Sequence, residues 1–113
     1  KTTFFAMGGK FSAAPVHYHQ HAMSHLILGK KKWFIWPLRY SYFSNMPFVE
    51  EVNSNQIRYK KYARKCIQNP GDIIYVPHRS SHATLNIGNV NLGWSDEISY
   101  LPRNFYSTTT NTG

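Results

Sequence analysis

Short apolar segments separated by glycine, proline and asparagine dominate the hydrophobic pattern of this chain. Segments of this length, bounded by turn residues, are typical of strands rather than helices. Turns are expected at Gly8-Gly9, Gly29-Lys30 and Gly88-Asn89, and around Gly71. The strands predicted between them comprise residues 4–7, 16–19, 24–28, 31–36, 66–68, 73–76, 82–87 and 90–98.

The middle of the chain lacks this pattern. Residues 38–55 are interrupted by asparagine and proline, so an irregular connection is expected there, and no periodicity supports a helix. Many short strands in a chain of 113 residues predict an all-β fold, either a closed barrel or two packed sheets. We expect one domain at residues 1–106 and a flexible polar tail at 107–113, which has no apolar side chain.

Composition adds a strongly basic surface to this picture. The chain carries 13 Lys and Arg against 5 Asp and Glu, a formal net charge of +8. A run of five cations is compatible with an acidic protein partner, a larger assembly or nucleic acid, but a solvated face is the favoured interpretation because no nucleic-acid motif accompanies it. These cations are Arg58, Lys60, Lys61, Arg64 and Lys65.

Hydropathy and cysteine content exclude two classes of structure. No apolar run approaches the roughly 20 residues that a transmembrane helix requires, so a soluble chain is expected in the cytoplasm or an organelle interior. Cys66 is the only cysteine, which excludes an internal disulfide and a multi-cysteine zinc site. We expect Cys66 to be a small buried residue.

Two histidines near the start of the chain have the spacing of metal ligands. His17 and His19 lie in a predicted strand, where alternation places both imidazoles on one face. Imidazole pairs of this kind suit Fe, Zn, Cu or Ni rather than Ca or Mg. The pair alone is a weak signal, because surface and packing histidines occur at the same spacing.

A second segment strengthens the metal hypothesis. Gly71 is followed by Pro77 after five residues, by His82 after four more and by Asn86 after three more. This spacing resembles the second motif of the cupin superfamily, G-x5-P-x-G-x2-H-x3-N, with Arg79 in place of the inner glycine. The glutamate of the first cupin motif is missing after His17-Tyr18-His19.

The fuller resemblance is to the Jumonji C (JmjC) branch of the cupins. In that branch a first histidine and a neighbouring acid precede G-x-K-x-W-x-x-x-x-P, and a turn precedes Y-x-P and the distal histidine. The corresponding residues here are His17-Tyr18-His19, the segment from Gly29 to Pro37 with three residues rather than four before the proline, Tyr75-Val76-Pro77 and His82. The resemblance covers residues 4–98 and is greatest to the Jumonji-domain-containing protein 8 type, whose members carry H-x-H and HATLN.

The resemblance implies a fold, a metal and a cosubstrate. The fold would be a double-stranded β-helix, the jelly-roll barrel of cupins, and His17, His19 and His82 would bind Fe(II) or another divalent metal at the catalytic centre. Lys31 would bind the distal carboxylate of 2-oxoglutarate, although it also fits an exposed cation in a three-lysine turn. Asn86 would contribute to cofactor binding, or else be an end-of-strand amide.

Two departures from the family pattern bear on activity. His19 stands at the position of the family's acid, so the metal charge is less compensated and a higher oxidation state of iron is disfavoured. Ala14 stands where a hydroxyl residue often helps to hold the cosubstrate, and Ser12 is a poor substitute. Three functions are therefore compatible with the sequence. The first is an Fe(II)-dependent hydroxylase or demethylase, with or without 2-oxoglutarate, that acts on a protein or small molecule. The others are an inactive JmjC-like scaffold in a larger assembly and a three-histidine cupin that uses metal alone.

Overall fold

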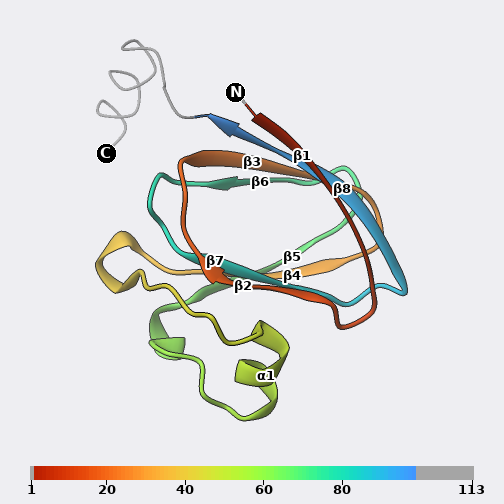
Figure 1. The fold of residues 1–113 in the computed structure, drawn as a ribbon. Coiled ribbons are helices and arrows are strands. Elements are labelled where there is room, and N and C mark those ends of the chain that lie inside the picture. The colour runs from red at the N-terminus through yellow and green to blue at the C-terminus, as the bar shows by residue number, and fades with distance from the viewer. Residues whose placement is uncertain (1, 99–113) are drawn as a thin grey trace.

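Two antiparallel four-stranded sheets form the framework of the protein (Figure 1). The computed structural model describes residues 2–98. The first sheet has the order β1-β8-β3-β6 and the second sheet has the order β2-β7-β4-β5. The strands are β1 Thr2–Gly9, β2 Ala13–His17, β3 His21–Leu28, β4 Lys31–Ile35, β5 Arg64–Gln68, β6 Ile73–Val76, β7 His82–Asn86 and β8 Val90–Ile98.

The space between the sheets is filled by side chains on their inner faces. In β4 the alternation of side chains places Trp33 and Ile35 inward, where they pack with Ala22 and Val76 from the first sheet. Trp33 and Val76 are almost fully buried. The all-β jelly-roll architecture predicted from the sequence is therefore confirmed.

A buried glutamine joins the two sheets. Gln68, on β5, is 0% exposed. Its Oε1 accepts a hydrogen bond from Trp33 Nε1 at 2.8 Å, and its Nε2 donates to the carbonyl oxygens of Ser24 at 3.0 Å and Asp72 at 3.1 Å. Because Ser24 belongs to β3 of the first sheet, the Gln68 side chain connects the two sheets.

The outer face of the second sheet is covered by the segment between β4 and β5. This segment contains the short helices η1 Leu38–Tyr40, α1 Phe48–Asn53 and η2 Lys60–Tyr62, and α1 lies below the second sheet in Figure 1. No periodicity in the sequence supported a helix here, because the six residues of α1 are too few to show one. A second core forms beneath the segment from Val16, Phe34, Trp36, Tyr42, Phe48 and Ala83.

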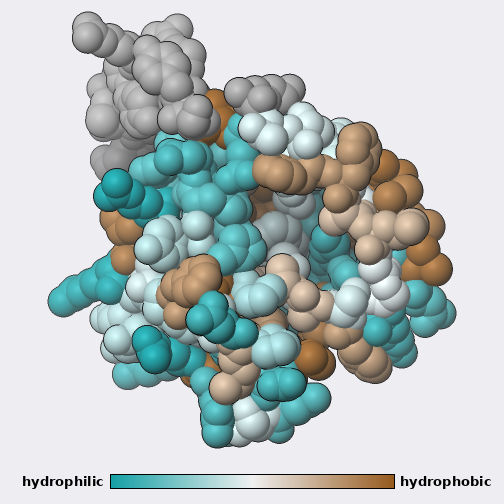
Figure 2. All heavy atoms as spheres, viewed as in Figure 1, coloured by the Kyte–Doolittle hydropathy of each residue, from teal (hydrophilic) through white to brown (hydrophobic). Residues whose placement is uncertain are grey.

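The outer face of the first sheet carries apolar side chains that the rest of residues 2–98 leaves uncovered. Phe5 is 78% exposed and Met7 is 80% exposed, and their partners across the ladder are Trp94 and Leu92. In Figure 2 hydrophobic residues gather on the side where β1 and β8 run, whereas hydrophilic residues dominate the surface around α1.

Most predicted strands and turns are present, with shifted boundaries. Gly29 and Gly71 adopt φ values of +100° and +91° in their turns, which glycine adopts without a steric penalty. The strand predicted at 16–19 is wrong at its end, because β2 stops at His17, and β3 begins at His21 rather than Ser24. The predicted tail at 107–113 lies outside the described residues. Within residues 2–98 no helix has the length and apolar character to cross a membrane.

Candidate metal centre

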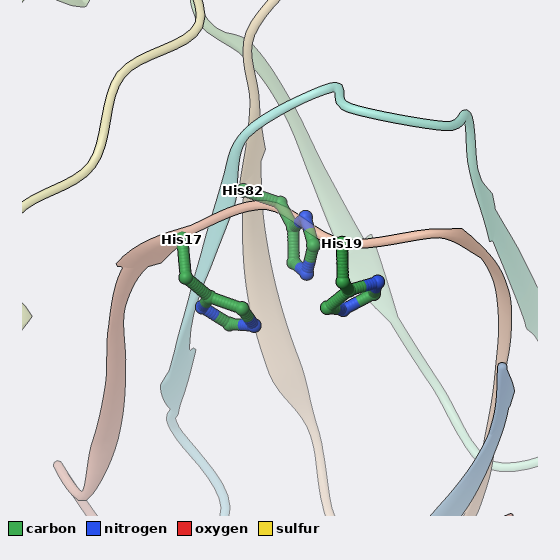
Figure 3. A group of neighbouring side chains, drawn as sticks. All are labelled: His17, His19 and His82. Atoms are coloured by element: carbon green, nitrogen blue, oxygen red, sulfur yellow. The ribbon is translucent and has the colours of Figure 1, made fainter. Parts of the chain in front are cut away.

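Strand register brings two of the predicted ligands together. His17 is the last residue of β2 and His82 is the first residue of β7, and the two are partners across the antiparallel ladder. Side chains of directly opposed residues lie on the same face of a sheet. Their ring centroids are 4.3 Å apart, inside the space between the sheets (Figure 3).

His19 reaches the same point from a loop. It lies between β2 and β3, so the strand alternation used to predict its direction does not apply. The Arg79 backbone N–H donates to the His19 carbonyl at 2.9 Å, which ties this loop to the loop that precedes His82. Arg79 has a φ of +62°, the left-handed conformation that explains why the cupin motif has glycine at this position. The His19 ring centroid lies 5.2 Å from that of His17 and 4.6 Å from that of His82.

Backbone carbonyls fix the tautomer of each ring. The Nδ1 atoms of His17, His19 and His82 lie 2.6, 2.8 and 3.0 Å from the carbonyl oxygens of Pro15, Gln20 and Ser80. A carbonyl only accepts hydrogen bonds, so each Nδ1 carries the proton and each Nε2 keeps a free lone pair. Ligating histidines commonly use their second nitrogen in this way, which orients the ring toward the metal.

The three rings approach the geometry of a three-imidazole metal site. One nitrogen from each ring lies within 4.8 Å of the others, and Figure 3 shows the rings directed toward a common point. Nitrogens in a tetrahedral site, at about 2.0–2.1 Å from zinc, are about 3.4 Å apart. A small inward movement of the rings would therefore complete a three-imidazole site, and the donor set fits a divalent transition metal.

Burial keeps the His17 and His82 rings neutral. Desolvation lowers the pKa of His82 to about 3, and the neighbouring His17 adds to the effect. Desolvation also lowers the pKa of His17, with a smaller contribution from His19. Because a metal binds only the neutral imidazole, protons compete weakly for these two ligands near neutral pH.

A small cavity adjoins the three histidines and contains Lys31. Its volume is about 170 Å³, and the other residues of its wall are Ala14, Ser24, Trp33, Thr84 and Ser95. Desolvation lowers the pKa of Lys31, and the ammonium group has no hydrogen bond or ion pair within residues 2–98. Lys31 therefore lies on the cavity wall, as the resemblance implied, rather than in an exposed turn.

Asn86, the other predicted cofactor-binding residue, does not reach this cavity. Its Nδ2 donates to Ser12 Oγ at 2.7 Å, close to the turn between β1 and β2. Asn86 is the fourth residue after His82, so it shares the inward face of β7 but lies farther along the strand. Ser12 is engaged there and by the Gly9 carbonyl, so it supplies no hydroxyl to the histidines.

Two further expectations concern residues outside the site. The prediction of a buried Cys66 is wrong, because the side chain is exposed on β5, the edge strand of the second sheet. Among the five predicted partner-binding cations, Arg58 lies over the Tyr42 ring, Lys61 over Tyr62 and Lys65 over Phe34. Lys60 donates to Asn55 Oδ1 at 3.2 Å, and Arg64 lines a separate cavity.

Sequence reasoning missed the polar groups that surround the ligands. Glu97, on β8, has its Oε1 atom 3.1 Å from His19 Nδ1 and supplies a carboxylate beside the imidazole that replaces the family's acid. Ser24, Thr84 and Ser95 supply hydroxyls to the cavity. Alternation could have identified Thr84 from His82, and Glu97 from Ser95, but only after the inward face of each strand was known.

Comparisons with known proteins agree with this geometry. The sequence profile of the JmjC domain matches residues 2–100. Arginine-specific demethylase JMJ20 of Arabidopsis thaliana is 35% identical over 97 residues, which cover 74% of this chain and 21% of that protein. JmjC domain-containing protein 8 of Homo sapiens is 30% identical over 87 residues, which cover 74% of this chain and 33% of that protein. The chain thus spans a fifth to a third of the length of these relatives.

Solved structures with low sequence identity share the fold. Drosophila melanogaster CENP-C, solved bound to CAL1, superposes with a TM-score of 0.62 at 7% identity, covering 85% of this chain and 60% of that one. Bacillus subtilis oxalate decarboxylase, studied for its Mn(II) centres, superposes with a TM-score of 0.55 at 18% identity, covering 98% and 28%. These structures share the fold, and the profile match over residues 2–100 shows that the chain belongs to the JmjC domain family.

Proposed function

We propose that this chain is the catalytic domain of an Fe(II)-dependent oxygenase that uses 2-oxoglutarate and acts on a protein or a small molecule. The observation that carries the proposal is the placement of an unpaired lysine beside three converging imidazoles in one cavity. Iron held there would supply the redox chemistry that couples oxidation of 2-oxoglutarate by dioxygen to oxidation of a substrate.

Each ligand has a defined role in this proposal. His17, His19 and His82 would present their Nε2 atoms to the metal, because their Nδ1 atoms donate to backbone carbonyls. Three protein ligands leave positions open on the ion for small ligands, as catalytic metal sites require. Glu97 adds a negative charge next to His19 and partly compensates the missing carboxylate ligand.

Lys31 would select the cosubstrate. An ammonium group in a cavity with apolar and hydroxyl walls is costly unless an anion meets it. The cavity of about 170 Å³ is of a size that suits a small dicarboxylate. The hydroxyls of Thr84, on the second sheet, and Ser95, on the first sheet, line the same cavity and would donate to a carboxylate in place of the hydroxyl that is missing at Ala14.

The name of one relative supports the same class of reaction. The Arabidopsis protein is called an arginine-specific demethylase, and this chain aligns with 21% of it. Oxidative demethylation and hydroxylation require the same metal and cosubstrate, so we propose the reaction class for this chain and leave its substrate open between a protein and a small molecule.

The proposal is tested by binding and turnover of 2-oxoglutarate. The chain loaded with Fe(II) is expected to release succinate, and Lys31→Met should reduce both succinate release and 2-oxoglutarate affinity at least tenfold. Lys32→Met is the matched control, because Lys32 lies on the opposite face of β4, over the Phe34 ring. Absence of both iron-dependent succinate release and 2-oxoglutarate binding in the wild-type chain would reject the proposal.

A second candidate function is a JmjC-like scaffold that docks through its basic surface. The third imidazole ligand favours it, as does the arrangement of the five-cation run, because Arg58, Lys61 and Lys65 lie over aromatic rings in fixed positions. An acidic protein or nucleic acid would bind there. Replacement of all five cations by glutamine should abolish partner association in a pull-down, and unchanged association would remove this candidate.

A further inference from the structure

A second cavity lies at the ends of β4 and β6, apart from the histidine site. Its volume is about 400 Å³, within the range of small-molecule pockets. Apolar and aromatic side chains form most of its wall, namely Ile35, Trp36, Pro37, Leu38, Tyr75 and Pro77. It shares no lining residue with the cavity that contains Lys31, so a ligand bound here would leave the metal ligands free.

Arg64 supplies a free positive charge to this cavity. It is the first residue of β5 and lies directly opposite Ile35, so its side chain is on the same face of the sheet as Ile35. Within the part of the chain that the structure describes, its guanidinium has no acidic partner, hydrogen bond or ring contact. Neighbouring Lys65, by contrast, faces the opposite side and lies over Phe34. A guanidinium with unused donors beside apolar walls is suited to a carboxylate.

His78 provides the second polar group. Its Nδ1 atom is buried and has no hydrogen-bond partner among the described residues, and its ring is held in place by the His21 ring at a centroid distance of 5.3 Å. A buried polar atom without a partner is unfavourable, so a rotation of the ring that exposes Nδ1 to a ligand acceptor in the cavity gains a hydrogen bond. The third polar residue, Ser80, already donates its hydroxyl proton to the Trp36 carbonyl.

We propose that this cavity binds a small carboxylic acid with an apolar body. Its carboxylate would accept hydrogen bonds from Arg64 and from His78 as the Nδ1–H tautomer, and its body would pack against Ile35, Leu38 and Pro77. One guanidinium and one imidazole match a single carboxylate group. Apolar walls exclude a nucleotide or a polyanion, which would need more donor groups than one guanidinium and one imidazole.

The cavity has a structural connection to the metal centre. Ser80 lines the cavity, and its carbonyl oxygen accepts the hydrogen bond from His82 Nδ1. Binding of the acid itself requires no metal, because none of its contacts involves His17, His19 or His82. Acid binding in this cavity is therefore independent of whether the chain is an oxygenase.

The probe for this site is 3-phenylpropionate, compared with the neutral 3-phenylpropanamide, in the presence of EDTA. Titration followed by amide NMR is expected to shift the signals of Ile35, Leu38 and Arg64, with the amide probe at least tenfold weaker. Arg64→Gln should weaken binding of the acid by about ten- to a hundredfold, the value of a charge-assisted hydrogen bond. Arg64 is exposed, so the variant is expected to fold, and far-UV circular dichroism checks this.

Lys65→Gln is the matched control, since it removes the same charge from the next residue on the opposite face of β5. It should leave the affinity for 3-phenylpropionate within about twofold of the wild type. The proposal is overturned if the probe shifts no cavity residue up to its solubility limit, if the acid and the amide bind equally, or if Arg64→Gln and Lys65→Gln weaken binding to the same extent.

Discussion

Acid should destabilise the metal-free chain through His82. This side chain is 3% exposed, and burial lowers its pKa from 6.5 to about 3. The unfolded chain takes up a proton near pH 6.5, whereas the folded chain does not until about pH 3, so the free energy of unfolding decreases as the pH falls through this interval. At pH 4 the linkage relation gives a loss of about 3 kcal/mol relative to pH 7, and above pH 6.5 this residue contributes no pH dependence.

Urea unfolding in EDTA, followed by tryptophan fluorescence at pH 4 to 7, measures this effect. His82→Asn removes the titrating ring while its amide can still donate to the Ser80 carbonyl, so the variant should lose about 3 kcal/mol less than the wild type over this range. His25→Asn is the control and should keep the wild-type slope, because His25 stacks on Trp94 away from the site. The chain has only 5 acidic residues, which limits competing carboxylate titration. A wild type with constant stability from pH 6.5 to 4, or an equally steep His82→Asn, would refute the reasoning.

Three further substitutions test the packing around the site. Gln68→Leu removes three hydrogen bonds of a buried amide and should lower the free energy of unfolding in urea by about 3 kcal/mol. Gln56→Leu, at an exposed position, should lower it by under about 0.5 kcal/mol. Equal effects would contradict a connecting role for the buried amide. Phe48→Ala should lower the free energy of unfolding by about 3–5 kcal/mol, because the Phe48 ring is fully buried against the second sheet. A decrease below about 1 kcal/mol would show that α1 adds little to the core. Lys31→Met should leave the melting temperature of the metal-free chain unchanged or raise it, because the substitution removes an unpaired cation from a cavity wall. A marked decrease in melting temperature would contradict the placement of Lys31 on that wall.

The strands and turns were predictable because they depend on local chemistry. Gly29 and Gly71 occupy turn conformations with positive φ, and the apolar runs between turns correspond to the strands on both sides of them. The helix α1 was not predictable, because it is too short to show a period and is stabilised by Phe48 packing against Phe34 from a distant strand. The same long-range packing buries Trp36, which sequence alone assigned to the end of a strand.

The sequence predicted which three histidines converge, but only part of the reason why they converge. His17 and His82 converge through strand register, as expected, but His19 converges through a loop that the Arg79 backbone holds in place. The contribution of Glu97 could not be predicted, since it depends on β8 lying next to β3 in the first sheet, and the order of strands in a sheet leaves no local signal.

X-ray absorption of the chain loaded with one equivalent of Zn(II) tests metal binding at the three histidines most directly. The structure predicts a first shell with three imidazole nitrogens at about 2.0–2.1 Å. His82→Asn should lower the imidazole count by one and weaken zinc binding, whereas His25→Asn should change neither. A shell built from oxygen alone, or an imidazole count unaffected by His82→Asn, would contradict a metal centre at His17, His19 and His82.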